Sequence, residues 1–183
     1  ADFDPAHILR AEELAENIRE SFADEDGGYF RTAIDAEKLL IRPKEIFDGA
    51  MPSGNGAALV LFDRLFRLTG KEPWRAAAEE QRSFISRSAG QYPAGCCYAL
   101  TAMLTDGASR ELVCVTPDET LPETLKAVLS RYAPELTVLV KTPANAAALA
   151  AAAPYTADMQ PKDGKPAYYV CTGGSCALPV DMG

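Results

Sequence analysis

Histidine is almost absent from this chain of 183 residues, in which His7 is the single example. A zinc site built on imidazoles needs several histidines, and a Ser-His-Asp triad needs one at its centre. His7 lies in the predicted first turn of a helix near the N-terminus, where it reads as a surface residue. We therefore predict neither kind of site, and no metal or cofactor.

The sequence also lacks a long apolar run and an excess of basic residues. A membrane-spanning helix needs about 18 or more consecutive apolar residues, and no such stretch occurs. Lysine and arginine number 18 against 26 aspartates and glutamates, which gives a formal net charge of −8. Nucleic-acid binding needs clustered positive charge. We expect no membrane span, no signal peptide and no nucleic-acid partner.

The five cysteines are an odd number. Cys96 and Cys97 are adjacent, a geometry that disfavours a bond between them. Cys114 lies in an apolar run, which is typical of a small core residue. We expect a reducing compartment and hence a cytoplasmic protein.

The first half of the chain predicts four helices of two kinds. Residues 6–22 and 73–88 each carry one apolar stripe, the pattern of a half-exposed helix. A helix that ends at Leu68 and another over 94–104 are apolar on almost every side, as buried helices are. This alternation predicts two concentric layers of helices, the arrangement of an α/α toroid built from helical hairpins. Four helices cannot close such a ring, so we expect a portion of one.

The spacing of the apolar residues changes after residue 107. Short apolar runs at 112–115, 136–140 and 167–171 predict strands, and residues 121–132 and 144–153 predict the helices between them. Strand and helix in alternation favour a parallel sheet with right-handed crossovers.

The predicted fold class is therefore mainly α, a portion of an α/α-hairpin toroid with a small C-terminal α/β unit of about three parallel strands. The predicted domains are residues 1–108, the toroid-like helical part, and residues 109–183, the α/β appendage.

The segment from Asp48 to Ala58 is the strongest candidate for a binding site. It is rich in turn residues and opens into an apolar helix, whose free N–H groups can bind a ligand. Asp48 is the candidate general acid or base, or a ligand for sugar hydroxyls. Ser53 and Asn55 are the candidate ligand-binding residues. The alternative is that all three only fix a turn and cap a helix.

A second candidate consists of Cys171 and Cys176, which flank a glycine-rich loop at the end of a predicted strand. Two thiols so placed could form a reversible disulfide or half of a metal site. Two ligands do not complete a structural zinc site, and no helix follows the glycines as a dinucleotide-binding loop requires. The alternative is a glycine turn with two partly buried cysteines.

Three blocks of the sequence resemble one protein family, and a fourth fits as well. They are Gly27-Gly28-Tyr29-Phe30, the block Lys44–Asn55, Tyr169-Val170-Cys171 with Cys176-Ala177-Leu178-Pro179, and the fourth, Arg64–Gly70. They are similar to the C-terminal part of the thioredoxin-domain-containing, spermatogenesis-associated protein family, over nearly the whole chain. The resemblance implies a toroid related to six-hairpin glycosidases and N-acylglucosamine 2-epimerases. The chain departs from the family at Gly56, where serine is usual, and lacks the ring histidines of the related epimerases.

We therefore expect the C-terminal portion of a larger toroid protein, with a pocket that binds or modifies a sugar-like small molecule. Asp48 would be catalytic, and Ser53 and Asn55 would line the pocket. The alternative is a redox-linked binding or interaction module that uses Cys171 and Cys176 and performs no catalysis. The open edge of a partial ring would expose apolar side chains, so we also expect self-association.

Overall fold

The computed structural model describes residues 2–37, 40–106, 109–172 and 175–180, which form two compact units. The sheet unit comprises Ala1–Leu9, Arg67–Gly70 and Ala108–Gly183, and the helical unit comprises Arg10–Phe66 and Lys71–Gly107. Each unit has its own core. No helix among the described residues is long and apolar enough to cross a membrane.

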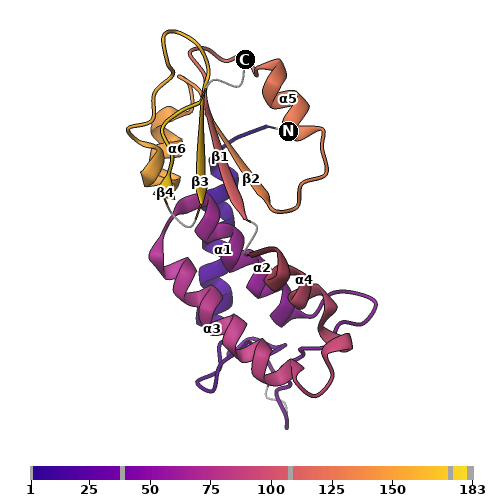
Figure 1. Cartoon of the computed structure of the whole chain (residues 1–183). Helices are drawn as coiled ribbons and strands as arrows, with labels where there is room; N and C mark the ends of the chain where they lie inside the picture. The colour runs from indigo at the N-terminus through magenta and orange to yellow at the C-terminus, as the bar shows by residue number, and fades with distance from the viewer. Residues whose placement is uncertain (1, 38–39, 107–108, 173–174, 181–183) are drawn as a thin grey trace. The chain divides into compact units, whose positions relative to one another are not determined.

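The helical unit packs its helices around one apolar core (Figure 1). Its elements are most of α1 (Ala6–Phe22), most of α2 (Gly54–Thr69), α3 (Glu72–Ala89), the 3-10 turn η1 (Pro93–Cys96) and α4 (Cys97–Asp106). Leu59, Phe62 and Leu65 recur every third residue along α2 and are all buried. The ring of Phe62 stacks on Trp74 of α3 with the centroids 6.1 Å apart. Burial of such a stripe is the main source of stability for a helix of this length.

A long irregular segment, residues 23–53, separates α1 from α2 and is ordered by side chains. The ammonium of Lys44 pairs with the carboxylate of Asp24 and donates a hydrogen bond to the carbonyl of Gly27 at 2.9 Å. It also lies 5.5 Å from the ring centroid of Phe30 and 5.3 Å from that of Phe84. The hydrogen bond from Lys44 lowers the pKa of Asp24. One lysine thus holds the start and the end of this segment beside α3.

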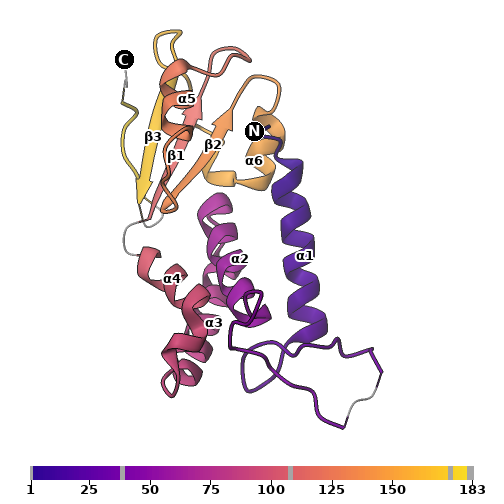
Figure 2. The same ribbon diagram turned by 90° about the vertical axis from the view of Figure 1, so that its right-hand side faces the viewer.

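Among its described residues, the sheet unit contains a sheet of four strands and two short helices. Its elements are β1 (Arg110–Val115), α5 (Glu123–Leu129), β2 (Leu136–Lys141), α6 (Ala146–Ala152), the 3-10 turn η2 (Pro154–Thr156), β3 (Ala167–Thr172) and β4 (Ser175–Cys176). The strand order is β2-β1-β3-β4. β1 pairs with β2 in parallel and with β3 antiparallel, and β3 pairs antiparallel with β4. Figure 2 shows β2, β1 and β3 side by side.

The two helices cover opposite faces of this sheet (Figure 1). Leu112 and Cys114 of β1 pack with Leu125 of α5, whereas Val113 packs with Leu149 of α6. Successive side chains of a strand point to opposite faces, so one strand supplies both cores. This accounts for the unbroken apolar run at residues 112–115. Strand β1 is buried from Glu111 to its end.

The prediction of a mainly helical toroid with about three parallel strands is wrong. The structure is 47% helix and 15% strand, and its sheet is mixed, with parallel and antiparallel strands. Helix α4, predicted to be buried all round, leaves Cys97, Tyr98, Thr101 and Leu104 exposed. An inner helix of a ring has neighbours on every side, whereas this helix packs on one side only.

The chain that leads into β3 is held at the end of β2. The ammonium of Lys141, the last residue of β2, donates hydrogen bonds to the carbonyls of Thr156, Ala157 and Met159, each at 2.8 Å. The chain after α6 is therefore anchored where β2 ends. It then enters β3 at this same end of the sheet. Val115, the last residue of β1, pairs with Lys141 of β2 on one side and with Ala167, the first residue of β3, on the other.

We expect Lys141→Met to destabilise the protein by about 2–4 kcal/mol, because it leaves three carbonyls without their donor at a largely buried place. The matched control is Lys126→Met on α5, whose side chain is half exposed and makes one ion pair within its own helix. The control should change stability by less than about 0.5 kcal/mol. Urea unfolding of both variants measures the difference, and equal effects would contradict the role given to Lys141.

Candidate functional site

Asp48 links the first turns of two helices. One carboxylate oxygen accepts a hydrogen bond from the N–H of Ser53 at 2.9 Å, and the other accepts from the N–H of Tyr98 at 2.8 Å. The N–H of Asp48 itself donates to the carbonyl of Gly95 at 2.6 Å. Helix N-termini carry partial positive charge, so they are favourable places for a carboxylate. The half-buried Asp48 therefore caps the starts of α2 and α4.

Ser53 and Gly56 form the first turn of α2. Ser53 is buried, and its hydroxyl oxygen accepts a hydrogen bond from the N–H of Gly56 at 3.1 Å, as a helix N-cap does. A Cβ at Gly56 would lie 3.0 Å from this hydroxyl and 3.4 Å from the ring of Tyr98. The tighter of these two contacts is with the hydroxyl of the Ser53 cap, so glycine at position 56 leaves room for the cap in this turn.

Asn55 is the central hydrogen-bonding residue of the helical unit and is only 2% exposed. Its side-chain oxygen accepts from the N–H of Tyr29 at 2.8 Å and from the amide of Gln81 at 3.0 Å. Its side-chain nitrogen donates to the carbonyls of Tyr29 at 2.9 Å and Glu45 at 2.8 Å. These bonds use both donors and both acceptor positions of the amide. No hydrogen-bonding capacity of Asn55 is left for a ligand.

The three residues lie together, as the sequence suggests, and their hydrogen bonds go to the protein itself. An open depression of about 400 Å³ is lined by residues 48–52 together with Cys97, Tyr98 and Thr101. Of the three candidates only Asp48 lines it, and the predicted lining residues Ser53 and Asn55 do not. Sequence reasoning missed the three α4 residues, because it expected that helix to be buried. Catalysis by Asp48 and sugar binding by Ser53 and Asn55 stay predictions.

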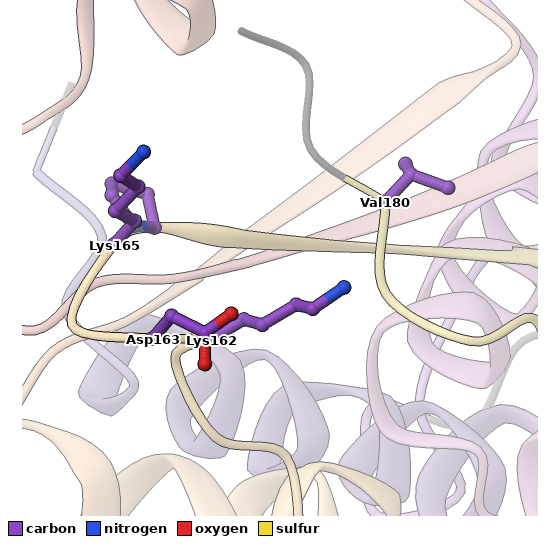
Figure 3. A pocket seen from close by; sticks show the side chains of 5 residues that line it. Lys162, Asp163, Lys165 and Val180 are labelled. Atoms are coloured by element: carbon purple, nitrogen blue, oxygen red, sulfur yellow. The ribbon is translucent and has the colours of Figure 1, made fainter.

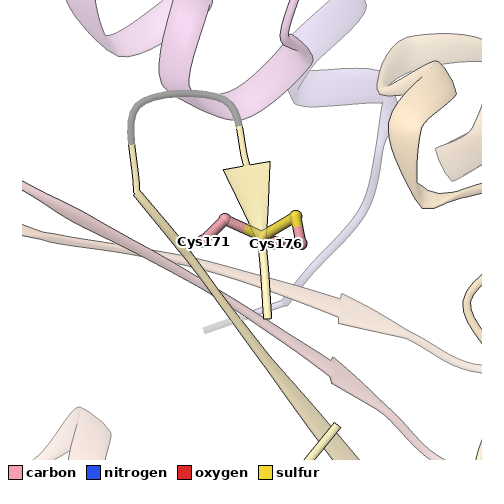
Figure 4. The surroundings of a disulfide bond; sticks show 2 residues. All are labelled: Cys171 and Cys176. Carbon is pink, nitrogen blue, oxygen red and sulfur yellow. A yellow bond between two sulfur atoms is a disulfide. The ribbon is translucent and has the colours of Figure 1, made fainter. Parts of the chain in front are cut away.

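Cys171 and Cys176 form a disulfide between β3 and β4 (Figure 4). They face each other in the antiparallel register, next to the pair of Thr172 and Ser175. Cys171 is only 3% exposed and packs in the core on the α6 face of the sheet, whereas Cys176 is exposed. The described part of the chain has no group of three or more His, Cys, Asp or Glu side chains that could hold a metal ion.

The segment Ser175–Val180, here called the strap, runs along the outer edge of β3. Besides the two strand pairs, the N–H of Ala177 donates to the carbonyl of Val170 at 2.9 Å, and Val180 exchanges two hydrogen bonds with Tyr168. Between the pair Cys171–Cys176 and the pair Tyr168–Val180, the strap advances by four residues and β3 by three. The extra residue is a bulge, and it occurs beside Pro179, which has no N–H to donate. The strap is therefore a short, interrupted edge strand.

A small pocket of about 130 Å³ lies at the far end of the strap, lined by residues 162, 163, 165, 166 and 180 (Figure 3). One wall of the pocket is the turn before β3, in which Asp163 and Gly164 have φ of 51° and 71°. The flanking residues Lys162 and Lys165 pair with each other through their backbones. Both lysines are exposed. The pocket marks where the strap meets the turn before β3, and its surface lysines assign it no ligand.

The other three thiols differ in their surroundings. Cys96 and Cys114 are buried, and Cys97 is exposed at the start of α4. Burial raises the pKa of Cys96, with a smaller contribution from the charge of Asp48. Burial also raises the pKa of Cys114, to about 11. Thiols react as thiolates, so the two buried ones are unreactive in the folded protein.

Comparison with known proteins assigns no family to this chain. No protein-family model matches it, and no curated protein matches it either. The resemblance that the sequence blocks suggest stays a prediction.

We expect Asn55→Ala to destabilise the helical unit by about 3 kcal/mol, because three backbone groups of the irregular segment lose their partner. The control is Gln91→Ala at an exposed position, with an expected change below about 0.5 kcal/mol. Denaturant unfolding followed by the fluorescence of Trp74 reports on this unit. A stable Asn55→Ala variant would show that the residue is free for another role.

Thiol labelling should divide the cysteines into three classes. In the native protein at pH 8 we expect rapid reaction at Cys97 alone, since Cys96 and Cys114 are buried and Cys171 and Cys176 are bonded. Unfolding should expose two further thiols, and added reductant the last two. Mass spectrometry after alkylation identifies each site, and Cys97→Ser should abolish the rapid phase. Rapid native labelling of Cys114 would contradict its burial.

Proposed function

We propose that this chain is a redox-linked interaction module, in which the Cys171–Cys176 disulfide decides whether the strap stays on β3. The observation that carries the proposal is the position of the bond. It joins a buried residue of a core strand to an exposed residue of a short edge segment. The module performs no catalysis of its own. We further propose that it works in the cytoplasm, where reduction is the resting condition and disulfide formation is the signal.

The exposure of the two cysteines sets the order of the exchange reaction. A thiolate of an external dithiol attacks the sulfur of the exposed Cys176, and the Cys171 sulfur leaves with the electron pair and takes up a proton. The second thiol of the dithiol then attacks the mixed disulfide and releases Cys176 as a thiol. Two electrons and two protons pass to the cysteines, and the dithiol becomes a disulfide. Oxidation by an external disulfide is the reverse.

The energetics make the disulfide a substantial part of what holds the strap. By the chain-entropy relation, closing so short a loop contributes about 2 kcal/mol. The strap side chains are exposed except for the half-buried Pro179, so burial of apolar surface contributes little. Each backbone hydrogen bond adds about 0.5–1.5 kcal/mol net. Loss of the disulfide therefore removes a contribution as large as two or three of these bonds.

Release of the strap would change what the sheet offers to other molecules. The carbonyls of Tyr168 and Val170 and the N–H of Tyr168 now bond to the strap. Without it they form an open strand edge, which is a template for pairing with another strand. The disulfide thus controls access to an interaction site made of backbone groups.

A carbohydrate pocket beside Asp48 is the second proposal. The open depression with Met51 and Tyr98 on its lining favours it, because aromatic and apolar surface beside a carboxylate suits a sugar ring. The backbone hydrogen bonds of Asp48 weigh against it as an acid or base, since each of its oxygens already serves a helix. We rank it below the redox-linked module for this reason.

Amide hydrogen exchange tests the redox-linked module in a Cys97→Ser background, which removes the exposed thiol. Reduction with a dithiol should speed exchange at Ala177 and Val180 by about 30-fold, the equivalent of 2 kcal/mol, and leave β1 and β2 protected. The added substitution Cys176→Ser should give the fast rates with or without reductant. Unchanged rates after complete reduction, or loss of protection throughout the sheet, would contradict the proposal.

A further inference from the structure

We infer that the strand that occupies the uncovered β3 edge is the strap of a second copy of this chain, so that reduced copies exchange straps and form a dimer. The inference rests on the proposed function, since the strap must first be released. The contacts that carry it are those of the closed hairpin, which a two-fold pair of chains can reproduce one by one.

The pairing of β3 with β4 has a symmetrical register. Cys171 faces Cys176 and Thr172 faces Ser175, so both pairs are centred between positions 173 and 174. If β3 and the strap of each copy run on as one extended strand, two copies pair antiparallel about a two-fold axis at this point. Cys171 of one copy then again faces Cys176, now of the other copy. The register of the exchanged dimer is therefore the register already observed.

The remaining contacts of the strap carry over in the same way. The hydrogen bond from Ala177 to Val170 and the pair of bonds between Val180 and Tyr168 need only backbone groups that each copy supplies. The strands Ala167–Thr172 and Ser175–Val180 contain no charged side chain. Two copies of a chain with net charge −8 can thus meet here without like charges facing each other. The strap of a second copy is a strand already known to fit β3.

Concentration and the disulfide decide between the closed and the exchanged form. Within one chain the strap has the advantage of a high effective concentration, in the millimolar range for a short link. An intrachain disulfide locks this closed form. After reduction, copies at high concentration can exchange straps with little change in free energy, because the closed monomer and the exchanged dimer contain the same contacts between strap and β3. Short links between exchanging elements favour this outcome.

Reoxidation would make the exchanged dimer covalent. Two reduced copies carry four thiols at Cys171 and Cys176. Two molecules of a low-molecular-weight disulfide, such as oxidised glutathione, accept four electrons and four protons and become four thiols. Two sulfur–sulfur bonds form, each between Cys171 of one copy and Cys176 of the other.

The experiment uses the full chain with Cys97→Ser, as an equal mixture of ¹⁴N- and ¹⁵N-labelled protein. The mixture is reduced at high concentration and reoxidised with oxidised glutathione. We expect a dimer of twice 19.6 kDa on a non-reducing gel and in light scattering. Cys171 and Cys176 lie on one tryptic peptide, because no lysine or arginine follows Lys165. Interchain bonding therefore appears as a linked pair of this peptide with mixed ¹⁴N and ¹⁵N mass.

Two variants of the turn make the test decisive. Deletion of Gly173 and Gly174 leaves no residues for a turn, so we expect a dimer at every concentration, also in reductant. Insertion of four residues between these glycines relaxes the link and should lower the dimer yield by about tenfold. A monomeric deletion variant, or reoxidation to intrachain bonds alone at high concentration, would overturn the inference. A reduced protein that stays monomeric at high concentration while the amide hydrogens of its strap exchange fast would do so too. That result leaves the redox-linked module intact and assigns the β3 edge to a strand of a different protein.

Discussion

Backbone groups that no helix or strand pairs must still find hydrogen-bonding partners, and in both units a buried polar side chain supplies several of them. In the helical unit Asn55 serves the irregular segment through Tyr29 and Glu45. In the sheet unit Lys141 serves three carbonyls after α6. Unpaired backbone groups in a protein interior are costly, so these side chains determine where the irregular chain can lie. Asn55 thereby ties the irregular segment to α2, and Lys141 ties the chain after α6 to the end of β2.

The edges of the sheet pose the opposite problem, because there the backbone groups face solvent. The strap covers the β3 edge with few hydrogen bonds, a bulge at Pro179 and a disulfide, while burying almost nothing. Such an edge is protected as long as its cover stays attached. A covalent tie that exchange chemistry can open is therefore a different kind of protection from a packed helix. This contrast is the physical basis of the proposed redox-linked module and of the strap exchange.

Much of the local structure could be predicted from the sequence, because its signals are local. The apolar stripe of residues 6–22 coincides with α1, and the apolar runs near residues 112, 136 and 167 lie in β1, β2 and β3. The candidate residues Asp48, Ser53 and Asn55 do lie close together. Their partners could not be predicted, since Tyr29, Gln81 and Tyr98 are 26 to 50 residues away along the chain. A turn-rich segment before a helix looks the same whether it holds a ligand or the rest of the protein.

The sequence by itself determined the positions of most helices and strands, through the periodicity of apolar residues. It also allowed, as one of several alternatives, that Cys171 and Cys176 face each other across a short loop. Tertiary structure alone decided the fold class, because the chain enters β3 at the end where β2 finishes and pairs there antiparallel with β1, which makes the sheet mixed. It also decided that α4 is exposed on one side and that Asn55 has no free hydrogen-bonding group. These outcomes rest on contacts between residues far apart in the chain, and apolar periodicity carries no information about such contacts.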